Sequence, residues 1–218
     1  MRIDFYTHIH KQQRKQMFAL STQLSEFSFT ESPQVEIFSK EWSGWLNDMQ
    51  HHMVSEETFV HPLLVKKMPN IEKNLHQEHE ELERELKNLD ESFNYFRLMS
   101  LTYPKLQEQA LEFYRGLNRF ISVYLMHINE EEYVMQNLWE IAVDGELRGM
   151  MIAFQTSDGI EKGKKWLLNN LPAMSANEKL LMFNTVKLLA PENIFISMCQ
   201  LTRDIMGEKE WQVINSQL

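Results

Sequence analysis

The stretch that decides the fold is "ALEFYRGLNRFISVYLMHINEEEYVMQNLW", residues 110–139. It contains one glycine and no proline, and its apolar residues recur at helical spacing instead of alternating with polar ones. The pattern predicts one helix that follows Tyr103-Pro104 and continues to about Ile141. Only seven glycines and six prolines occur in the 218 residues, and β-branched residues are scattered, so helical spacing dominates elsewhere too. We therefore expect an all-α protein.

Three more long helices are predicted in the first part of the chain, over about 5–26, 34–67 and 71–99. The second of these is expected to bend or stop at Pro62, because proline cannot donate the helical hydrogen bond and crowds the preceding turn. Four long helices with short connections pack most simply as an antiparallel up-and-down bundle, and the interior of such a bundle is a common place for metal and cofactor sites. We assign the bundle to residues 1–142.

Residues 143–218 are predicted to form a smaller helical C-terminal extension. Turn signals separate shorter helices over about 145–155, 157–170, 176–189, 192–206 and 208–214. Ser175 is expected to cap one of them. The extension has no histidine, so we expect it to pack on the bundle, to cover one end of it, or to form an oligomer surface, as in a homodimer.

The composition excludes several classes of protein. The net charge is −9 and lysines and arginines do not cluster, so we expect no nucleic-acid partner. No run approaches the roughly 18 apolar residues of a membrane span, and the start carries Asp4 where a signal peptide would be apolar. The single cysteine, Cys199, excludes an internal disulfide and a cysteine-based metal cluster. A cytoplasmic location is expected.

Two copies of a His-x-x-x-Glu spacing stand on separate predicted helices. His52 and Glu56 occur in "HHMVSEE", and His127 and Glu131 occur in "HINEEE". Residues four apart lie about 40° apart around a helix and one turn along it, so each histidine shares a face with its glutamate. Solvated surface pairs are the common alternative for such residues, but recurrence on two helices favours a site.

Other histidines join this pattern. All eight lie between His8 and His127, and "HQEH" places His76 and His79 three apart on the predicted third helix. The first helix offers His8 and His10. Imidazole and carboxylate suit iron, manganese and zinc, and a carboxylate can bridge two ions. Five histidines and two glutamates suit two ions better than one. A metal would also explain how two glutamates could face a bundle core.

This arrangement resembles the hemerythrin and HHE cation-binding family. The resemblance rests on "DFYTHIHK", "HHMVSEETFVHPLL", "HQEHEEL" and "LMHINEEE", and the tail "LLNNLPAMSANEKLLMFNTVKLLAPENIF" resembles bacterial members with a helical C-terminal extension. The resemblance implies a carboxylate-bridged, non-haem centre of two iron ions, with manganese or zinc as substitutes. It implies bridging roles for Glu56 and Glu131. The terminal ligands that it implies are His10, His52, His76, His79 and His127.

Two spacings differ from those of oxygen-carrying hemerythrins. Their third-helix histidines are four apart, whereas position four from His76 is Glu80, and their last carboxylate is an aspartate five after its histidine. The resemblance therefore implies a metal centre without implying reversible oxygen carriage. We expect Glu57 and Glu80 to orient ligands. His61 lies nine residues past His52, about 180° around an ideal helix, so it can approach the site only if Pro62 distorts the turn.

The leading function hypothesis is a di-iron protein that binds or senses oxygen, nitric oxide or peroxide, as in a stress response, or that handles iron. The alternatives are a redox enzyme, an iron donor for the repair of damaged iron centres, and a structural or regulatory helical protein with one metal or none. No His-Glu-x-x-His of zinc proteases, ferritin-type Glu-x-x-His, phosphate loop or nucleophile elbow occurs. The sequence predicts no catalytic side chain.

Overall fold

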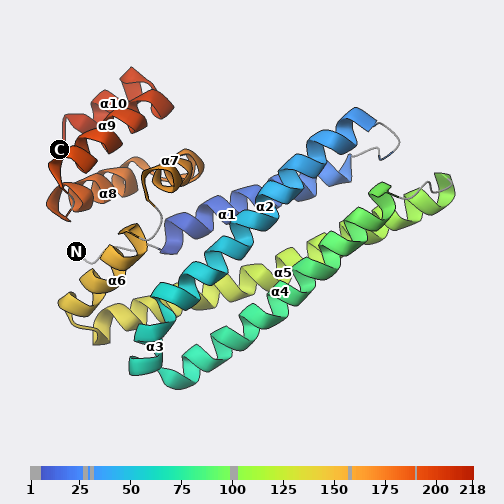
Figure 1. Cartoon of the computed structure of the whole chain (residues 1–218), viewed down its shortest axis with the longest axis horizontal. Helices are drawn as coiled ribbons and strands as arrows, with labels where there is room; N and C mark the ends of the chain where they lie inside the picture. Colours follow the sequence, from blue (N-terminus) through green and yellow to red (C-terminus); the bar gives the residue numbers. More distant parts are fainter. Residues whose placement is uncertain (1–5, 27–28, 30–31, 99–102, 157–158, 190) are drawn as a thin grey trace. The chain divides into compact units, whose positions relative to one another are not determined.

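The computed structural model describes residues 6–26, 29, 32–98, 103–156, 159–189 and 191–218. Every regular element in these ranges is a helix, so the predicted all-α class is confirmed (Figure 1). The chain forms two compact units, which we call the bundle unit (residues 13–150) and the C-terminal unit (residues 1–12 and 151–218). The boundary predicted at residue 142 stays a prediction. Within the described ranges, no helix is long and apolar enough to cross a membrane.

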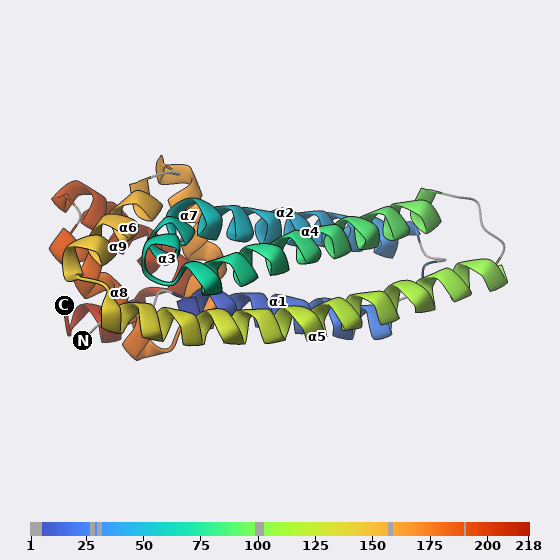
Figure 2. The ribbon, with the colours of Figure 1, turned by 90° about the horizontal axis from the view of Figure 1, so that it is seen from below.

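The predicted bundle is confirmed, with four long helices lying side by side (Figure 2). They are α1 (Tyr6–Ser25), α2 (Ser32–Phe59), α4 (Pro69–Leu98) and α5 (Tyr103–Ile141). Helix α5 ends at the predicted residue, but it begins at Tyr103, before Pro104 and not after it. A short helix, α3 (His61–Lys67), joins α2 to α4.

Side-chain contacts show that neighbouring helices run in opposite directions. Between α1 and α5, Ser21 donates to Asn118 at 2.7 Å, whereas Gln13, nearer the start of α1, accepts from Tyr124, further along α5, at 3.1 Å. Between α2 and α4, the Trp42 indole N–H donates to Asp90 at 2.9 Å, whereas Glu57, further along α2, lies 3.0 Å from His76, nearer the start of α4. These polar contacts fix the register of each pair.

The bundle core is built from apolar stripes in which buried residues alternate at spacings of three and four, the repeat expected for helices packed in a bundle. Gly116 lets α5 approach α4 closely, because a Cβ there would lie 3.0 Å from Leu89 Cδ2. The buried stripes are Met17, Leu20 and Leu24 on α1; Phe38, Trp42, Trp45 and Met49 on α2; Leu82, Leu86, Leu89 and Phe93 on α4; and Phe113, Leu117, Phe120 and Tyr124 on α5.

The predicted break near Pro62 is confirmed, and it comes before the proline. Helix α2 ends at Phe59, and α3 begins at His61 with Pro62 in its first turn, where a missing N–H costs nothing. Val60 is buried at this junction. The chain direction therefore changes just before His61, which removes this residue from the face that α2 would have given it.

The C-terminal unit contains the short helices that the sequence predicts. Helices α8 (Ala176–Leu189) and α9 (Glu192–Met206) have the predicted bounds, and the others are α6 (Asp144–Thr156), which begins in the bundle unit, α7 (Gly159–Asn170), the 3₁₀ turn η1 (Leu171–Ala173) and α10 (Glu208–Asn215). Their shared core includes Leu167, Leu171, Met174, Met182, Phe183, Trp211 and Ile214.

The start of α8 is held by a capping box, as the predicted capping role of Ser175 requires. Glu178 accepts from the Ser175 backbone N–H at 2.7 Å, and Ser175 Oγ accepts from the Glu178 N–H at 3.4 Å. Lys11 also donates to Glu178. Burial raises the pKa of Glu178, but the bonds from Lys11 and Ser175 outweigh it and lower the pKa from 4.5 to about 2.

This lowered pKa predicts acid sensitivity of the C-terminal unit. The stabilisation by Glu178 is present above pH 4.5 and is lost as the pH falls through about 2. Glu178→Gln should lower stability at neutral pH by about 1 kcal/mol and weaken the acid dependence. Urea unfolding followed by circular dichroism at several pH values measures both effects. Glu85→Gln, an exposed change on α4, is the control, and equal curves for both variants would contradict the prediction.

Candidate metal centre

The candidate ligands in the bundle unit continue the apolar stripes of their own helices. On α2 the stripe that ends at Met49 continues at His52 and Glu56, and on α5 the stripe that ends at Tyr124 continues at His127 and Glu131. On α4, His79 occupies the stripe position between Leu75 and Leu82. The bundle therefore turns these polar side chains inward for the same geometric reason that it buries their apolar neighbours.

A first cluster joins α2 to α5. His52 Nε2 lies 3.0 Å from Glu56 Oε1, which confirms the predicted shared face of this pair. His52, Glu56 and Glu131 each offer one ligand atom within 4.8 Å of the others. Glu56 and Glu131 are only 3% and 2% exposed, which is rare for carboxylates without a charged partner or a metal.

A second cluster joins α4 to α5 and shares Glu131 with the first. His79, His127 and Glu131 offer ligand atoms within 4.8 Å of one another. Glu131 Oε1 lies 3.3 Å from His79 Nε2 and 3.2 Å from His127 Nε2. Glu56 Oε2 also lies 3.6 Å from His79 Nε2. Two carboxylates from two helices thus lie among buried imidazoles, an arrangement consistent with a binuclear metal site.

Outer carboxylates hold the imidazoles of the second cluster from behind. His127 Nδ1 lies 2.7 Å from Glu78 Oε2, and His79 Nδ1 lies 3.4 Å from Glu57 Oε1. When Nδ1 donates its proton to an outer carboxylate, Nε2 can bind a metal. Histidines that bind metals are usually oriented by such a carboxylate. Glu57 therefore lies where an orienting residue was predicted.

Comparison with known proteins identifies the family. Residues 1–139 match the hemerythrin HHE cation-binding domain. The chain belongs to the hemerythrin family. No curated protein and no solved structure matches the chain. The family resemblance read from the ligand motifs is therefore confirmed, and in this chain a helical region follows the hemerythrin domain.

The electrostatics of the hemerythrin domain fit a cation at this centre. Burial lowers the pKa of His127, but the charge of Glu131 and the hydrogen bonds to Glu131 and Glu78 outweigh burial and raise the pKa to about 9. Burial also lowers the pKa of His79, and its hydrogen bond with Glu131 and the charge of Glu56 more than offset that effect. In the metal-free domain, imidazolium protons thus balance the buried carboxylates, and bound cations would replace those protons.

Two predicted residues on α4, His76 and Glu80, have exposed side chains and lie outside these clusters. The His76 side chain is 51% exposed, and its Nδ1 lies 3.0 Å from Glu57 Oε1. Glu80 is also exposed on α4. His10 belongs to the C-terminal unit by sequence position and is buried, with its ring at the edge of the Tyr6 ring (centroids 5.2 Å apart, planes at 87°). The His8 side chain lies outside the described part of the chain.

His61 lies closer to the second cluster than helical periodicity predicts. It is 5% exposed, and its ring centroid lies 5.3 Å from that of His79 with the planes within 20° of parallel. Its Nδ1 lies 3.2 Å from Glu72 Oε1. Burial and the nearby charge of His79 lower the pKa of His61, which favours the neutral imidazole. The break between α2 and α3 produces this position, because an unbroken α2 would have turned His61 about 180° away from His52.

Three residues that support the hemerythrin centre were not among the predicted site residues. Glu78 and Glu72 reach histidines on other helices or across a helix break, so no local spacing reveals them. Tyr124 is fully buried one turn before His127 and donates to Gln13. Burial, together with the charges of Glu56 and Glu131, raises the pKa of Tyr124 well above 10 and keeps its hydroxyl protonated. A signal for Tyr124 existed, since it continues the stripe that holds His127.

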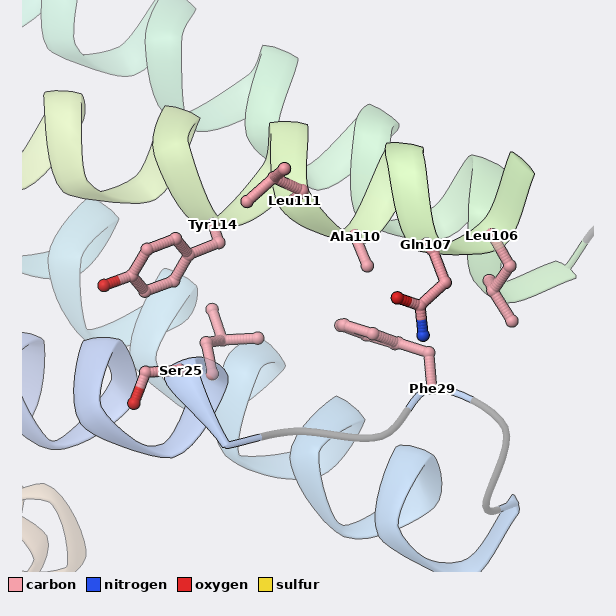
Figure 3. Close-up of a pocket in the computed structure, with 8 residues that line it drawn as sticks. Ser25, Phe29, Leu106, Gln107, Ala110, Leu111 and Tyr114 are labelled. Atoms are coloured by element: carbon pink, nitrogen blue, oxygen red, sulfur yellow. The ribbon is translucent and has the colours of Figure 1, made fainter. Parts of the chain in front are cut away.

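A separate pocket of about 370 Å³ opens at the other end of the bundle (Figure 3). Its lining includes Leu24, Phe29, Leu106, Leu111 and Tyr114. Tyr114 and His127 are 13 residues apart on α5, so the helical rise separates the pocket from the His/Glu clusters by about 20 Å. Among the residues that the structure describes, the lining contains neither histidine nor carboxylate, so the pocket is distinct from the candidate metal centre.

Proposed function

We propose that this hemerythrin domain holds two iron ions and binds or senses a small oxidant or diatomic molecule. The observation that carries the proposal is the sharing of Glu131 between two buried histidine clusters, with Glu56 beside it. Nitrogen and carboxylate ligands without thiolate suit iron or manganese, and shared carboxylates suit a pair of ions. Zinc in structural sites usually takes four tetrahedral ligands, often including cysteine, so it fits less well.

The proposed ligands divide between two positions. His52 and Glu56 would hold one ion, His79 and His127 would hold the other, and Glu131 would contact both. Glu56 is the second shared carboxylate, because one of its oxygens lies near His52 and the other near His79. Iron bound there would supply one-electron redox chemistry and an affinity for oxygen, nitric oxide or peroxide.

His10 stays a predicted ligand, as the family motif implies. It is buried, and it continues the spacing of Gln13, Met17, Leu20 and Leu24 along α1.

The side chains around the centre have defined tasks in this proposal. Glu57 and Glu78 accept the Nδ1 protons of His79 and His127 and so direct each Nε2 inward. Tyr124, whose ring centroid lies 6.0 Å from that of His127, stays protonated and offers no charge to a metal. The buried walls exclude bulk water, which strengthens the attraction between cations and carboxylates.

Metal analysis after anaerobic purification with ferrous iron tests the proposal. The chain should contain close to two irons, and an oxygen-dependent visible absorption band should appear on exposure to air. His52→Ala should lower the iron content, because it removes a ligand from the first position. His51→Ala is the matched control, since His51 is the adjacent exposed residue. One zinc or no metal per wild-type chain would overturn the proposal, and so would full iron content in His52→Ala.

A further inference from the structure

His61 shares the features that mark the two histidines of the second cluster. His79, His127 and His61 are all buried, and the Nδ1 of each lies against an outer carboxylate, from Glu57, Glu78 and Glu72 respectively. In each case Nδ1 lies where it can donate to the outer carboxylate, so Nε2 is the nitrogen that remains for a metal. Because a carboxylate contacts the Nδ1 of all three imidazoles, we infer that all three have the same role.

The ring of His79 lies beside both of the other imidazoles. The centroids of His79 and His127 are 4.8 Å apart, and those of His61 and His79 are 5.3 Å apart, only slightly further. His76 differs in each respect. Its ring centroid is 6.5 Å from that of His61, and its side chain is half exposed. Burial therefore favours His61 over His76 as the additional nitrogen donor.

We propose that His61 is the third imidazole ligand of the ion held by His79 and His127, in the place that the sequence motifs gave to His76. The inference rests on the proposed function, because it assumes a metal at the second position. The bond would form between His61 Nε2 and the ion, while the Nδ1 proton stays on the imidazole and is accepted by Glu72. The helix break at Val60 then explains how His61 reaches the ion, because a continuous α2 would turn His61 away from the site.

Anaerobic titration of the full-length protein with cobalt(II) tests the inference without relying on activity. The d–d absorption of cobalt reports its coordination number, and competition with a chelator reports affinity. Wild type and His76→Ala should bind two cobalt ions with equal spectra. His61→Ala should bind one of the two ions more than about 100-fold more weakly, a larger loss than the 10- to 100-fold expected from losing an outer support. Its d–d bands should also change.

Two further measurements separate a ligand from a packing residue. Free imidazole added to His61→Ala should restore the wild-type cobalt spectrum, which a mere packing role would not allow. Glu72→Gln, which keeps His61 but weakens its support, should reduce affinity for the same ion about 10-fold, and it serves as the test if His61→Ala does not fold.

The outcomes distinguish this inference from the proposed function. If the wild type binds fewer than two ions, the proposed two-metal centre fails. If the wild type binds two ions, and His61→Ala binds both with unchanged affinity and spectrum, only the role of His61 fails. Loss of affinity in His76→Ala but not in His61→Ala would likewise overturn the inference and return the role to His76.

Discussion

Glu131→Gln is expected to remove more than half of the bound metal, the largest effect of any single change in the site. Glu131 belongs to both clusters, with one oxygen 3.3 Å from His79 Nε2 and 3.2 Å from His127 Nε2. Glutamine has the same shape but lacks the charge, and a neutral amide is a poor bridge between two cations. Iron content should fall from close to two per chain to below about one, as measured by metal analysis after anaerobic purification.

A matched control and a second readout accompany this prediction. Glu130→Gln changes the preceding, exposed glutamate and should leave the metal content unchanged. In the metal-free protein, the pKa of His127 should fall from about 9 in Glu131→Gln, because the charge of Glu131 contributes to raising it. NMR titration of the histidine ring measures this shift. Two irons retained in Glu131→Gln would contradict the shared role of this carboxylate.

Trp42→Ala is expected to be the most destabilising change in the bundle core. The indole is 1% exposed and packs against Phe38, Trp45, Phe93 and Phe113, with ring centroids 5.1 to 6.3 Å apart. Removing it opens a cavity between α2, α4 and α5 and also removes the hydrogen bond to Asp90. The free energy of unfolding of the bundle should fall by about 3–5 kcal/mol, measured by urea denaturation.

The location of Trp42 separates stability from metal binding. Trp42 precedes His52 by ten residues, about 15 Å along α2, so the folded fraction of Trp42→Ala should still bind its metal ions. Tyr95→Ala is the control, because Tyr95 is an aromatic residue of the same bundle that is 52% exposed. The control should lose less than about 0.5 kcal/mol. An equal loss in both variants would show that the aromatic cluster does not carry the stability assigned to it.

Local periodicity predicted most of the fold and part of the site. The bounds of α8 and α9 and the end of α5 follow from the positions of apolar residues, turn signals and prolines, all of which act within one or two turns. The His52/Glu56 and His127/Glu131 pairs follow from the same periodicity, because residues four apart on a helix must lie on one face. These are short-range relations, and a helix obeys them whatever it packs against.

The histidine pair on α4 shows where motif spacing alone was insufficient. His76 and His79 are three residues apart, and both could share a face, but the structure buries His79 and exposes His76. The stripe of Leu75, Leu82 and Leu86 contained the missing signal. It continues through position 79 and not through position 76, so the packing of apolar neighbours sets the rotation of the helix.

The sequence by itself determined that the chain is helical, that His52/Glu56 and His127/Glu131 each share a helix face, and that the chain resembles the hemerythrin family. Only the tertiary structure decided which groups from different helices meet. It brought Glu131 into contact with His79 and placed Glu78 against Nδ1 of His127. It also changed the direction of His61, because α2 ends before Pro62. The physical reason is that helical periodicity fixes directions within one helix, whereas contacts between helices depend on their packing, register and ends.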